Sequence, residues 1–413
     1  MNSTIRIVYA ISAVAVFYGN VHNYLHDHHG MGVPWHWVLA FIVFSLPVLF
    51  KQLLQSDLLR QPIVLWCLGY AWLTMVWFLW GPQSDMAWQE VRWRVLAVIE
   101  MLSFLAVFMD ERADRFARIS LVVGVHLGTA INVYELFVPM SFSNVYGRSA
   151  GLYLSPNLSG EALVLGMILG VTVLPTWYRG IFVLIAAVGV FVTFSRGGLV
   201  GWGIAICGLL MGRFLGVTHF VRTGLVTMAV VILVLLPKAD DIMTTLERTG
   251  SLNANVLERL AWLTDPSGVS DASSWSRKYV AQQAWERVGE QPFLGGGTGA
   301  VHERLDIPPH NQFLAYMMDH GMLGAMLLPL LLLALLWRAK DESLRVGLIF
   351  CCAVLWFSFF THTMLNNSHS LLLFSLMAAL ASTGFRPLDR MILSRTVAEH
   401  PTLFEKPLAR THS

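Results

Sequence analysis

VTMAVVILVLL, the run from Val226 to Leu236, carries no charged side chain and shows no alternation of polar and apolar residues. LLPLLLLALL, from Leu327 to Leu336, is of the same kind. A transmembrane β-strand would alternate over about ten residues, because one of its faces meets lipid and the other a polar interior. Continuous apolar runs instead predict α-helices that cross a membrane, because a helix satisfies its own backbone hydrogen bonds in lipid.

The composition of the whole 413-residue chain extends this prediction. Apolar residues make up 55% and charged residues 13%, whereas a soluble globular chain is about 45–50% apolar and about 25% charged. This excludes a soluble enzyme, a disordered tail and a coiled coil. At about 20 residues a span, the apolar content suffices for about ten to twelve helices. We expect them near residues 4–20, 35–50, 61–80, 91–109, 117–138, 157–177, 180–194, 198–215, 219–237, 311–337, 344–361 and 368–384.

Lys and Arg residues predict the direction of these spans, because short cytoplasmic loops carry an excess of them. With the N-terminus in the cytoplasm, seventeen of them lie in inside segments and four in short outside loops. Both termini are therefore expected in the cytoplasm. The first run is expected to stay as an anchor rather than be cleaved as a signal peptide, because no small-x-small cleavage site precedes Gly19.

This topology divides the chain into four parts. Residues 1–237 would form nine spans, and 238–310 a large outside loop with a helical stretch at Arg277–Val288. Residues 311–384 would form three further spans, and 385–413 a basic cytoplasmic tail. A loop this long between two spans is usually functional, so we expect the site in the periplasm if the cell is Gram-negative.

Several other classes of site are not expected. The basic residues do not cluster on one face, which argues against nucleic-acid binding. Gly295–Gly299 lacks the Lys-Ser/Thr of a nucleotide-binding loop, so a turn is predicted there. His22, His26 and His29 could line one helical face and bind a transition metal, but a solvated cluster is the plainer interpretation. We expect neither a metal nor a cofactor.

The four cysteines lie inside apolar runs and predict no disulfide framework or zinc site: Cys67, Cys207, Cys351 and Cys352.

Few Lys and Arg residues lie in the loops predicted to be outside the cytoplasm, so the presence of each one there calls for an explanation. Arg148 lies in a Gly-containing segment before Ser155-Pro156-Asn157, and Arg196 lies in a tight Ser-Arg-Gly-Gly turn between two spans. Arg277 lies in the large loop. A guanidinium suits phosphate oxygens and keeps its charge, so the three arginines could converge on a pyrophosphate at the membrane face. The alternative for each is interfacial snorkelling or pairing with a local carboxylate.

His310 is the candidate general base. It lies in Pro308-Pro309-His310-Asn311-Gln312, where the tenth span is expected to begin. The positive end of a helix disfavours a charged imidazole, so a neutral His310 could accept a proton. The alternative is an ordinary interfacial histidine.

Further polar residues near the outer ends of spans are candidates too. Asp319 and His320 lie inside the tenth span, where ionisable side chains suggest function, although an internal polar contact is the alternative. Glu161 and Glu135 could pair with the arginines or serve a structural role.

At this point the sequence resembles the O-antigen ligase and polymerase family of bacterial membrane glycosyltransferases. Three stretches carry the resemblance over roughly residues 145–330. They are the Arg-Ser-x-Gly-x-x-x-x-Pro-Asn pattern of Arg148–Asn157, the Ser-Arg turn at Phe194–Gly197, and Ser276-Arg277 with the later Pro292–Gly297, His310–Leu314 and Gly321–Gly324 segments. Each motif is short and weak alone. Their order, their spacing and their common side of the membrane together make the resemblance to this family more specific.

The resemblance implies an all-α polytopic protein with a GT-C-like fold and a metal-independent, inverting transfer. Arg196 and Arg277 would hold the pyrophosphate of an undecaprenyl-linked glycan donor, and His310 would deprotonate the acceptor hydroxyl. Arg259 competes with Arg277 for the second pyrophosphate contact. Arg148, Asn157, Glu161 and Asn311 are further candidates for substrate binding. The acceptor would be lipid A-core, and the location the bacterial inner membrane.

Three other functions remain open. A polymerase would use the same motifs but transfer the glycan to a second undecaprenyl-linked unit. A transporter would place ionisable residues near the bilayer midplane, often within a repeat; only Glu100 and His126 are candidates, and no repeat is seen. A scaffold would tolerate replacement of all three arginines.

Overall fold

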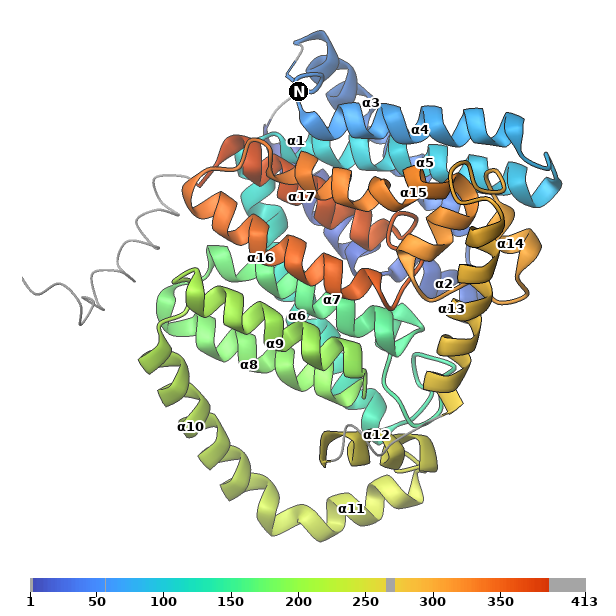
Figure 1. Cartoon of the computed structure of the whole chain (residues 1–413). Coiled ribbons are helices and arrows are strands. Elements are labelled where there is room, and N and C mark those ends of the chain that lie inside the picture. Colours follow the sequence, from blue (N-terminus) through green and yellow to red (C-terminus); the bar gives the residue numbers. More distant parts are fainter. Residues whose placement is uncertain (1–2, 56, 265–271, 386–413) are drawn as a thin grey trace, which may run out of the picture.

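The computed structural model describes residues 3–55, 57–264 and 272–385. Helices alone make up the regular structure of these residues (Figure 1). In chain order they are α1 (Ser3–Ala13), η1 (Val14–Tyr18), α2 (Val21–His29), α3 (Pro34–Leu54), α4 (Pro62–Trp80), α5 (Asp85–Phe108), α6 (Glu111–Phe137), η2 (Gly151–Tyr153), α7 (Pro156–Gly170), η3 (Val171–Val173), α8 (Thr176–Val192) and α9 (Arg196–Met211). They continue with α10 (Val217–Leu235), η4 (Leu236–Lys238), α11 (Ala239–Arg248), α12 (Ala254–Thr264), α13 (Ala272–Glu290), α14 (Ala300–Arg304), α15 (Gln312–Leu336), α16 (Asp341–Ser358) and α17 (Ser368–Thr383).

Each of the twelve predicted spans coincides with a helix of this series, and the all-α polytopic class is confirmed. Among the described residues, six helices are long and apolar enough to cross a membrane by length and composition. A seventh is gained if the bent pair Ser3–Tyr18 and Val21–His29 counts as one span. Three shorter apolar helices, α8, α9 and α17, coincide with other predicted spans. The helical stretch expected in the large loop is α13, and most of the predicted tail lies outside the described residues.

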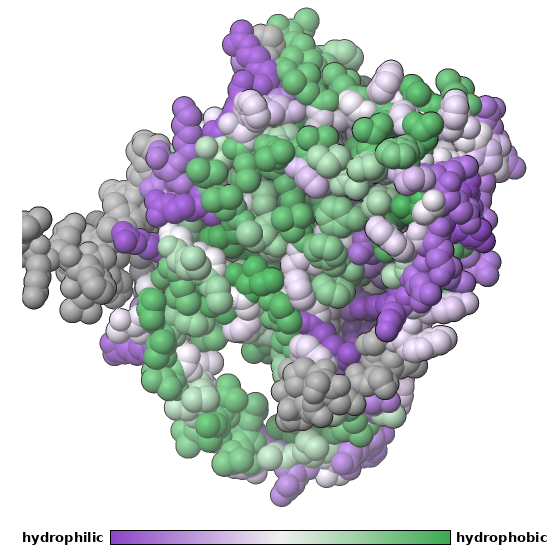
Figure 2. Space-filling model, in the orientation of Figure 1, coloured by the Kyte–Doolittle hydropathy of each residue, from purple (hydrophilic) through white to green (hydrophobic). Residues whose placement is uncertain are grey.

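The core of the bundle surrounds α7 and α17. Every residue of α17 from His369 to Ala381 is buried, and α7 is buried from Ser159 to Gly170. These helices are apolar on all sides because other helices cover all their faces, so neither shows an amphipathic pattern. At the other extreme, α10 buries none of its residues. Apolar side chains cover α10 at the edge of the molecule, whereas polar side chains gather along α13 (Figure 2). The exposed apolar surface of α10 is what contact with lipid requires.

The helix α15 is interrupted near its middle. Gly321 has φ 60° and ψ −146°, which is not helical, so the chain forms two helical halves at this point. The glycine-rich turn that follows α13 lies against the break: Gly296 and Gly297 donate their backbone N–H groups to the carbonyls of Met318 and Asp319, at 2.8 and 3.0 Å. Met322 donates to the carbonyl of Pro292 at 2.9 Å. The turn therefore supplies hydrogen bonds that the interrupted helix cannot make within itself.

Candidate functional site

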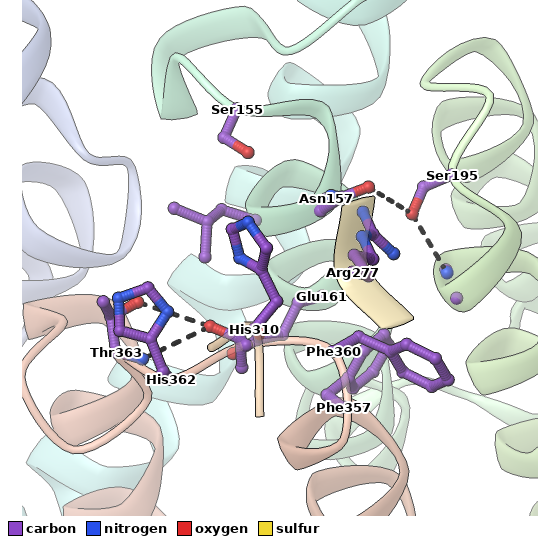
Figure 3. Close-up of a pocket in the computed structure, with 14 residues that line it drawn as sticks. Ser155, Asn157, Glu161, Ser195, Arg277, His310, Phe357, Phe360, His362 and Thr363 are labelled. Atoms are coloured by element: carbon purple, nitrogen blue, oxygen red, sulfur yellow. Dashed lines mark hydrogen bonds between the residues drawn. The ribbon is translucent and has the colours of Figure 1, made fainter. Parts of the chain in front are cut away.

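A cavity of about 200 Å³ lies where several helix ends meet at one end of the bundle (Figure 3). We call it the site cavity. It is smaller than a typical ligand pocket, so it can enclose the reacting part of a substrate but not a whole glycan. Its lining residues are Ser155, Asn157, Leu158, Glu161, Ser195, Gly197, Gly198, Arg277, His310, Phe357, Phe360, Thr361, His362 and Thr363.

The N-termini of three helices border the site cavity. Asn157 lies in the first turn of α7, and Ser195 is the N-cap of α9, whose Oγ accepts a hydrogen bond from Gly198 N at 3.2 Å. His310 lies two residues before α15 begins at Gln312. Helix N-termini carry partial positive charge and free N–H groups. The local backbone alone therefore favours an anion here.

Asn157 joins the two arginine-bearing segments that flank the cavity. Its Oδ1 accepts a hydrogen bond from Ser195 Oγ at 3.1 Å and another from Arg148 Nη2 at 3.2 Å. The Nε of Arg148 donates to the backbone carbonyl of Thr193 at 3.2 Å. Arg148 and the Ser-Arg turn are thus tied together through one amide side chain, although they lie far apart in the sequence.

Four guanidinium groups lie close together beside this turn. Arg148 is 9% exposed, and burial lowers its pKa to about 9, aided by the charges of Arg259, Arg277 and Arg196. Arg259 donates to the carbonyl of Phe194 at 3.3 Å, and the guanidinium of Arg196 lies 5.6 Å from the ring of Trp262. Like charges held together in a partly buried region create a strong positive potential, which an anionic group would relieve.

Arg277 and His310 both line the site cavity (Figure 3). Partial burial lowers the pKa of His310 below its usual value of 6.5, and the charge of Arg277 lowers it further. The imidazole is therefore neutral near pH 7, and it remains exposed to the cavity. The predicted cause, the positive end of α15, has the same sign, but burial and Arg277 are the physical reasons found here.

The other predicted site residues have varied surroundings. Arg196 does not itself line the cavity, although its neighbours Ser195 and Gly197 do. Glu161 lines the cavity and contacts α17, where His369 Nε2 lies 3.8 Å from Glu161 Oε1 and Ser370 Oγ donates to that oxygen at 3.3 Å.

Asn311 and Glu135 are both engaged in holding the backbone. Asn311 is the N-cap of α15, and its Oδ1 accepts from Leu314 N at 3.0 Å. Glu135 was expected to be a possible partner of an arginine. It instead accepts four backbone N–H groups on both sides of Arg148, those of Phe142 and Ser143 before it and of Ala150 and Gly151 after it.

The segment between α16 and α17 also lines the cavity, although no sequence pattern predicted it. His362 lines the cavity, and its ring centroid lies 5.7 Å from that of His310. Thr361 and Thr363 lie beside it, and Phe357 and Phe360 form an apolar wall. No short motif marks this segment, since its position depends on how α16 and α17 pack.

Asp319 and His320 lie away from the site cavity, in a buried polar network with Arg94 of α5. Arg94 Nη2 donates to Asp319 Oδ2, and Arg94 Nη1 donates to His320 Nε2 at 2.8 Å. Asp319 Oδ1 accepts from Val301 N at 3.0 Å. The internal polar contact, which was the alternative interpretation, is the one observed.

The histidine cluster of the first outside loop has separate partners. His22 Nδ1 lies 3.2 Å from the carbonyl of Val16, and His26 Nδ1 lies 2.8 Å from that of Gly32. Among the described residues, no three His, Cys, Asp or Glu side chains gather as a metal site would require. The Gly295–Gly299 segment is a turn against α15, as described above.

The fold and the cavity define a polytopic all-α membrane protein with a cationic site at one end of its bundle. Residues 181–329 of this chain match the family whose description is O-antigen ligase. No curated protein matches the chain. The matched segment extends from α8 into α15 and includes Arg196, Arg259, Arg277 and His310. This supports the assignment of the chain to the O-antigen ligase and polymerase family, and with it a function of that type.

Proposed function

We propose that this protein is an O-antigen ligase that transfers a glycan from undecaprenyl pyrophosphate to lipid A-core at the periplasmic face of the inner membrane. The observation that carries the proposal is the meeting of Arg277 and His310 in one cavity, beside the N-termini of α7 and α9. A site that combines fixed cations with a neutral base suits the departure of an anionic leaving group and the deprotonation of a hydroxyl.

The arginines would bind the pyrophosphate of the donor. When the bond between the anomeric carbon and the phosphate oxygen breaks, its electron pair leaves with undecaprenyl pyrophosphate. Arg196 and Arg277, with Arg148 and Arg259 nearby, would stabilise the charge that develops on that oxygen. Their positions are fixed before the substrate binds, so little reorganisation is needed during the reaction.

His310 would accept the proton of the acceptor hydroxyl as its oxygen attacks the anomeric carbon from the opposite side. Attack opposite to the leaving group inverts the anomeric configuration. The low pKa of His310 keeps the imidazole neutral near pH 7, as a general base requires. In this scheme the activated donor supplies the driving energy, and no metal or nucleotide takes part.

Asn157 and Glu161 are proposed to contact the substrates, because both line the site cavity. Asn157 Oδ1 already accepts from Arg148 and Ser195, which leaves its amide NH₂ as the group to donate to a phosphate or sugar oxygen. Asn311 is proposed to act mainly by capping α15 directly after His310. The bundle end that carries the cavity would face the periplasm, and both termini the cytoplasm.

The test is transfer by the purified, full-length protein in lipid nanodiscs. An undecaprenyl-pyrophosphate-linked glycan is the donor, and two acceptors are compared: lipid A-core and a second undecaprenyl-linked unit. The proposal predicts glycan on lipid A-core, detected by mass spectrometry. Transfer to the second donor unit alone would identify a polymerase instead. If folded protein transfers glycan to neither acceptor, the proposal is overturned.

A further inference from the structure

The break in α15 fixes the position of the chain on both sides of the glycine-rich turn. Besides the bonds from Gly296, Gly297 and Met322, the turn is held to α4: Thr298 Oγ1 donates to the carbonyl of Thr74 at 2.8 Å, and Trp77 Nε1 donates to that of Leu294 at 2.5 Å. The turn is therefore anchored to two helices of the bundle at once.

The geometry of this contact leaves no room for other residues at its centre. A Cβ on Gly321 would lie 2.3 Å from the carbonyl oxygen of Phe293, and a Cβ on Gly297 would lie 2.3 Å from the Cα of Gly81. Both glycines also have positive φ, at 60° and 97°. The close approach of three backbone segments is thus built into the sequence at these positions.

A buried ion pair lies next to the break in α15 at Gly321. Asp319 is fully buried and Arg94 is 3% exposed, and the two are joined by a hydrogen bond as well as by charge. Because an arginine can only donate, His320 accepts at Nε2 and carries its proton on Nδ1. The other oxygen of Asp319 accepts from Val301 N, which belongs to the short helix α14. One carboxylate thereby links α5, α14 and the break in α15.

The two cavity residues are attached to the two ends of this anchored unit. Arg277 is carried by α13, which runs into the turn, and His310 follows α14, which leaves it. Ala284 and Val288 of α13 share a small apolar cluster with Val301 and Leu305, and with Ala315 and Met318 of α15. The position of the turn therefore constrains where α13 and the His310 segment lie relative to each other.

We propose that Arg94 and Asp319 are positioning residues: through the turn at 292–299, they set the separation of Arg277 and His310. The role in catalysis rests on the proposed function, but the geometric claim does not. The pKa of His310 depends on its separation from Arg277, so the titration of His310 measures that separation indirectly. The groups facing His310 are Glu161 from α7, Arg277 from α13 and His362 from the segment before α17, and of these Arg277 lowers the pKa of His310.

The test is the pH dependence of His310 labelling by diethyl pyrocarbonate, which modifies the neutral imidazole. The full-length protein is labelled in nanodiscs, and the His310 peptide is quantified by mass spectrometry. We expect Asp319→Asn to raise the labelling midpoint of His310 toward 6.5, because Arg277 and the surrounding protein would then lie farther from the ring. Arg277→Gln should raise it as well, and adding Asp319→Asn to that variant should raise it little further.

A matched control is available in another buried Arg–Asp pair. Arg118 Nη2 lies 2.6 Å from Asp114 Oδ2, and both residues are buried, on α6. Asp114→Asn should lower thermal stability as Asp319→Asn does but leave the His310 midpoint unchanged. If Asp319→Asn does not yield folded protein, Arg94→Lys and Arg94→Gln replace it, and the lysine variant should show the smaller shift because it retains the charge.

Three outcomes would decide the matter. An unchanged midpoint in folded Asp319→Asn or Arg94→Gln protein would overturn the positioning role, and so would an equal shift in Asp114→Asn. A selective shift supports it even in a preparation that transfers no glycan. Failure of the proposed function and failure of this inference are therefore distinguishable.

Discussion

The imidazole rings of His310 and His362 lie with their centroids 5.7 Å apart in the site cavity, although one precedes α15 and the other precedes α17. The pKa of both is lowered, that of His362 to about 4, chiefly by burial. His310 is therefore the first of the two to become charged as the pH falls. A protonated imidazole cannot act as a base. Protonation of His310 should therefore stop the reaction as the pH falls, whereas His362 becomes charged only at lower pH.

The first prediction concerns this pH dependence. With His310 as the base, the rate should be near its maximum above pH 7 and fall on acidification through a midpoint below 6.5. His362→Ala should leave that midpoint almost unchanged, because His362 is neutral throughout this range. Arg277→Gln should move it upward. The measurement is kcat/KM for glycan transfer between pH 5 and 8, and a midpoint that moves with His362 rather than Arg277 would contradict the assignment.

The second prediction concerns the arginines. Arg196→Ala and Arg277→Ala should each reduce kcat for glycan transfer about 10²–10³-fold, the usual effect of losing one group that stabilises a developing anion. Arg287 is a matched control for Arg277, since it lies on the same helix in an exposed ion pair with Glu290, with N–O separation 2.8 Å. Arg222, exposed on α10, serves for Arg196. Equal activity of Arg277→Ala and Arg287→Ala would argue against the pyrophosphate role.

The third prediction concerns Glu135. Its two oxygens accept four backbone N–H groups of the 138–151 loop, at 2.7 to 3.2 Å. Glutamine has one acceptor oxygen, and its NH₂ group would face N–H donors. Glu135→Gln should therefore lower the free energy of unfolding by about 1–3 kcal/mol. Thermal unfolding in detergent measures this, with the exposed Glu290→Gln as the control that should change little.

The fourth prediction concerns the break in α15. Gly321→Ala combines a strained φ with a contact 2.3 Å from Phe293 O, so folded protein should be lost or stability lowered by at least about 1–3 kcal/mol. Gly203, in α9, has no atom within 4 Å of an added Cβ. Gly203→Ala should be neutral or slightly stabilising, because alanine favours the helix. Size-exclusion profiles and melting temperatures of the two variants compare them; equal behaviour would mean that the break tolerates an ordinary helical residue.

Much of the fold could be predicted from the sequence because helices in lipid leave a local signal. Each run had to be continuously apolar for its own length, whatever it packed against, and so the helix at Val226–Leu236 could be recognised without knowing its neighbours. The arginine-bearing turns were also local, since Gly197 and Gly198 follow Arg196 directly. These features need no information about distant contacts.

The rest depended on pairing between distant parts of the chain. Arg94 and Asp319 are 225 positions apart, and nothing near either residue indicates the other. His362 lies in a short connection without a motif. The break at Gly321 arises because the glycine-rich turn supplies outside hydrogen-bond partners for α15. Such features follow from packing, which the pattern of apolar residues does not encode.

The most direct measurement of the central claim is the initial rate of glycan transfer to lipid A-core by His310→Ala, compared with His219→Ala at equal amounts of folded protein. His219 is half-buried on α10 and does not line the cavity; its Nε2 lies 3.2 Å from the carbonyl oxygen of Trp177, so its loss should not affect the cavity. We expect a rate about 10²–10⁴-fold lower for His310→Ala and an unchanged rate for His219→Ala. Equal rates for the two variants would contradict it.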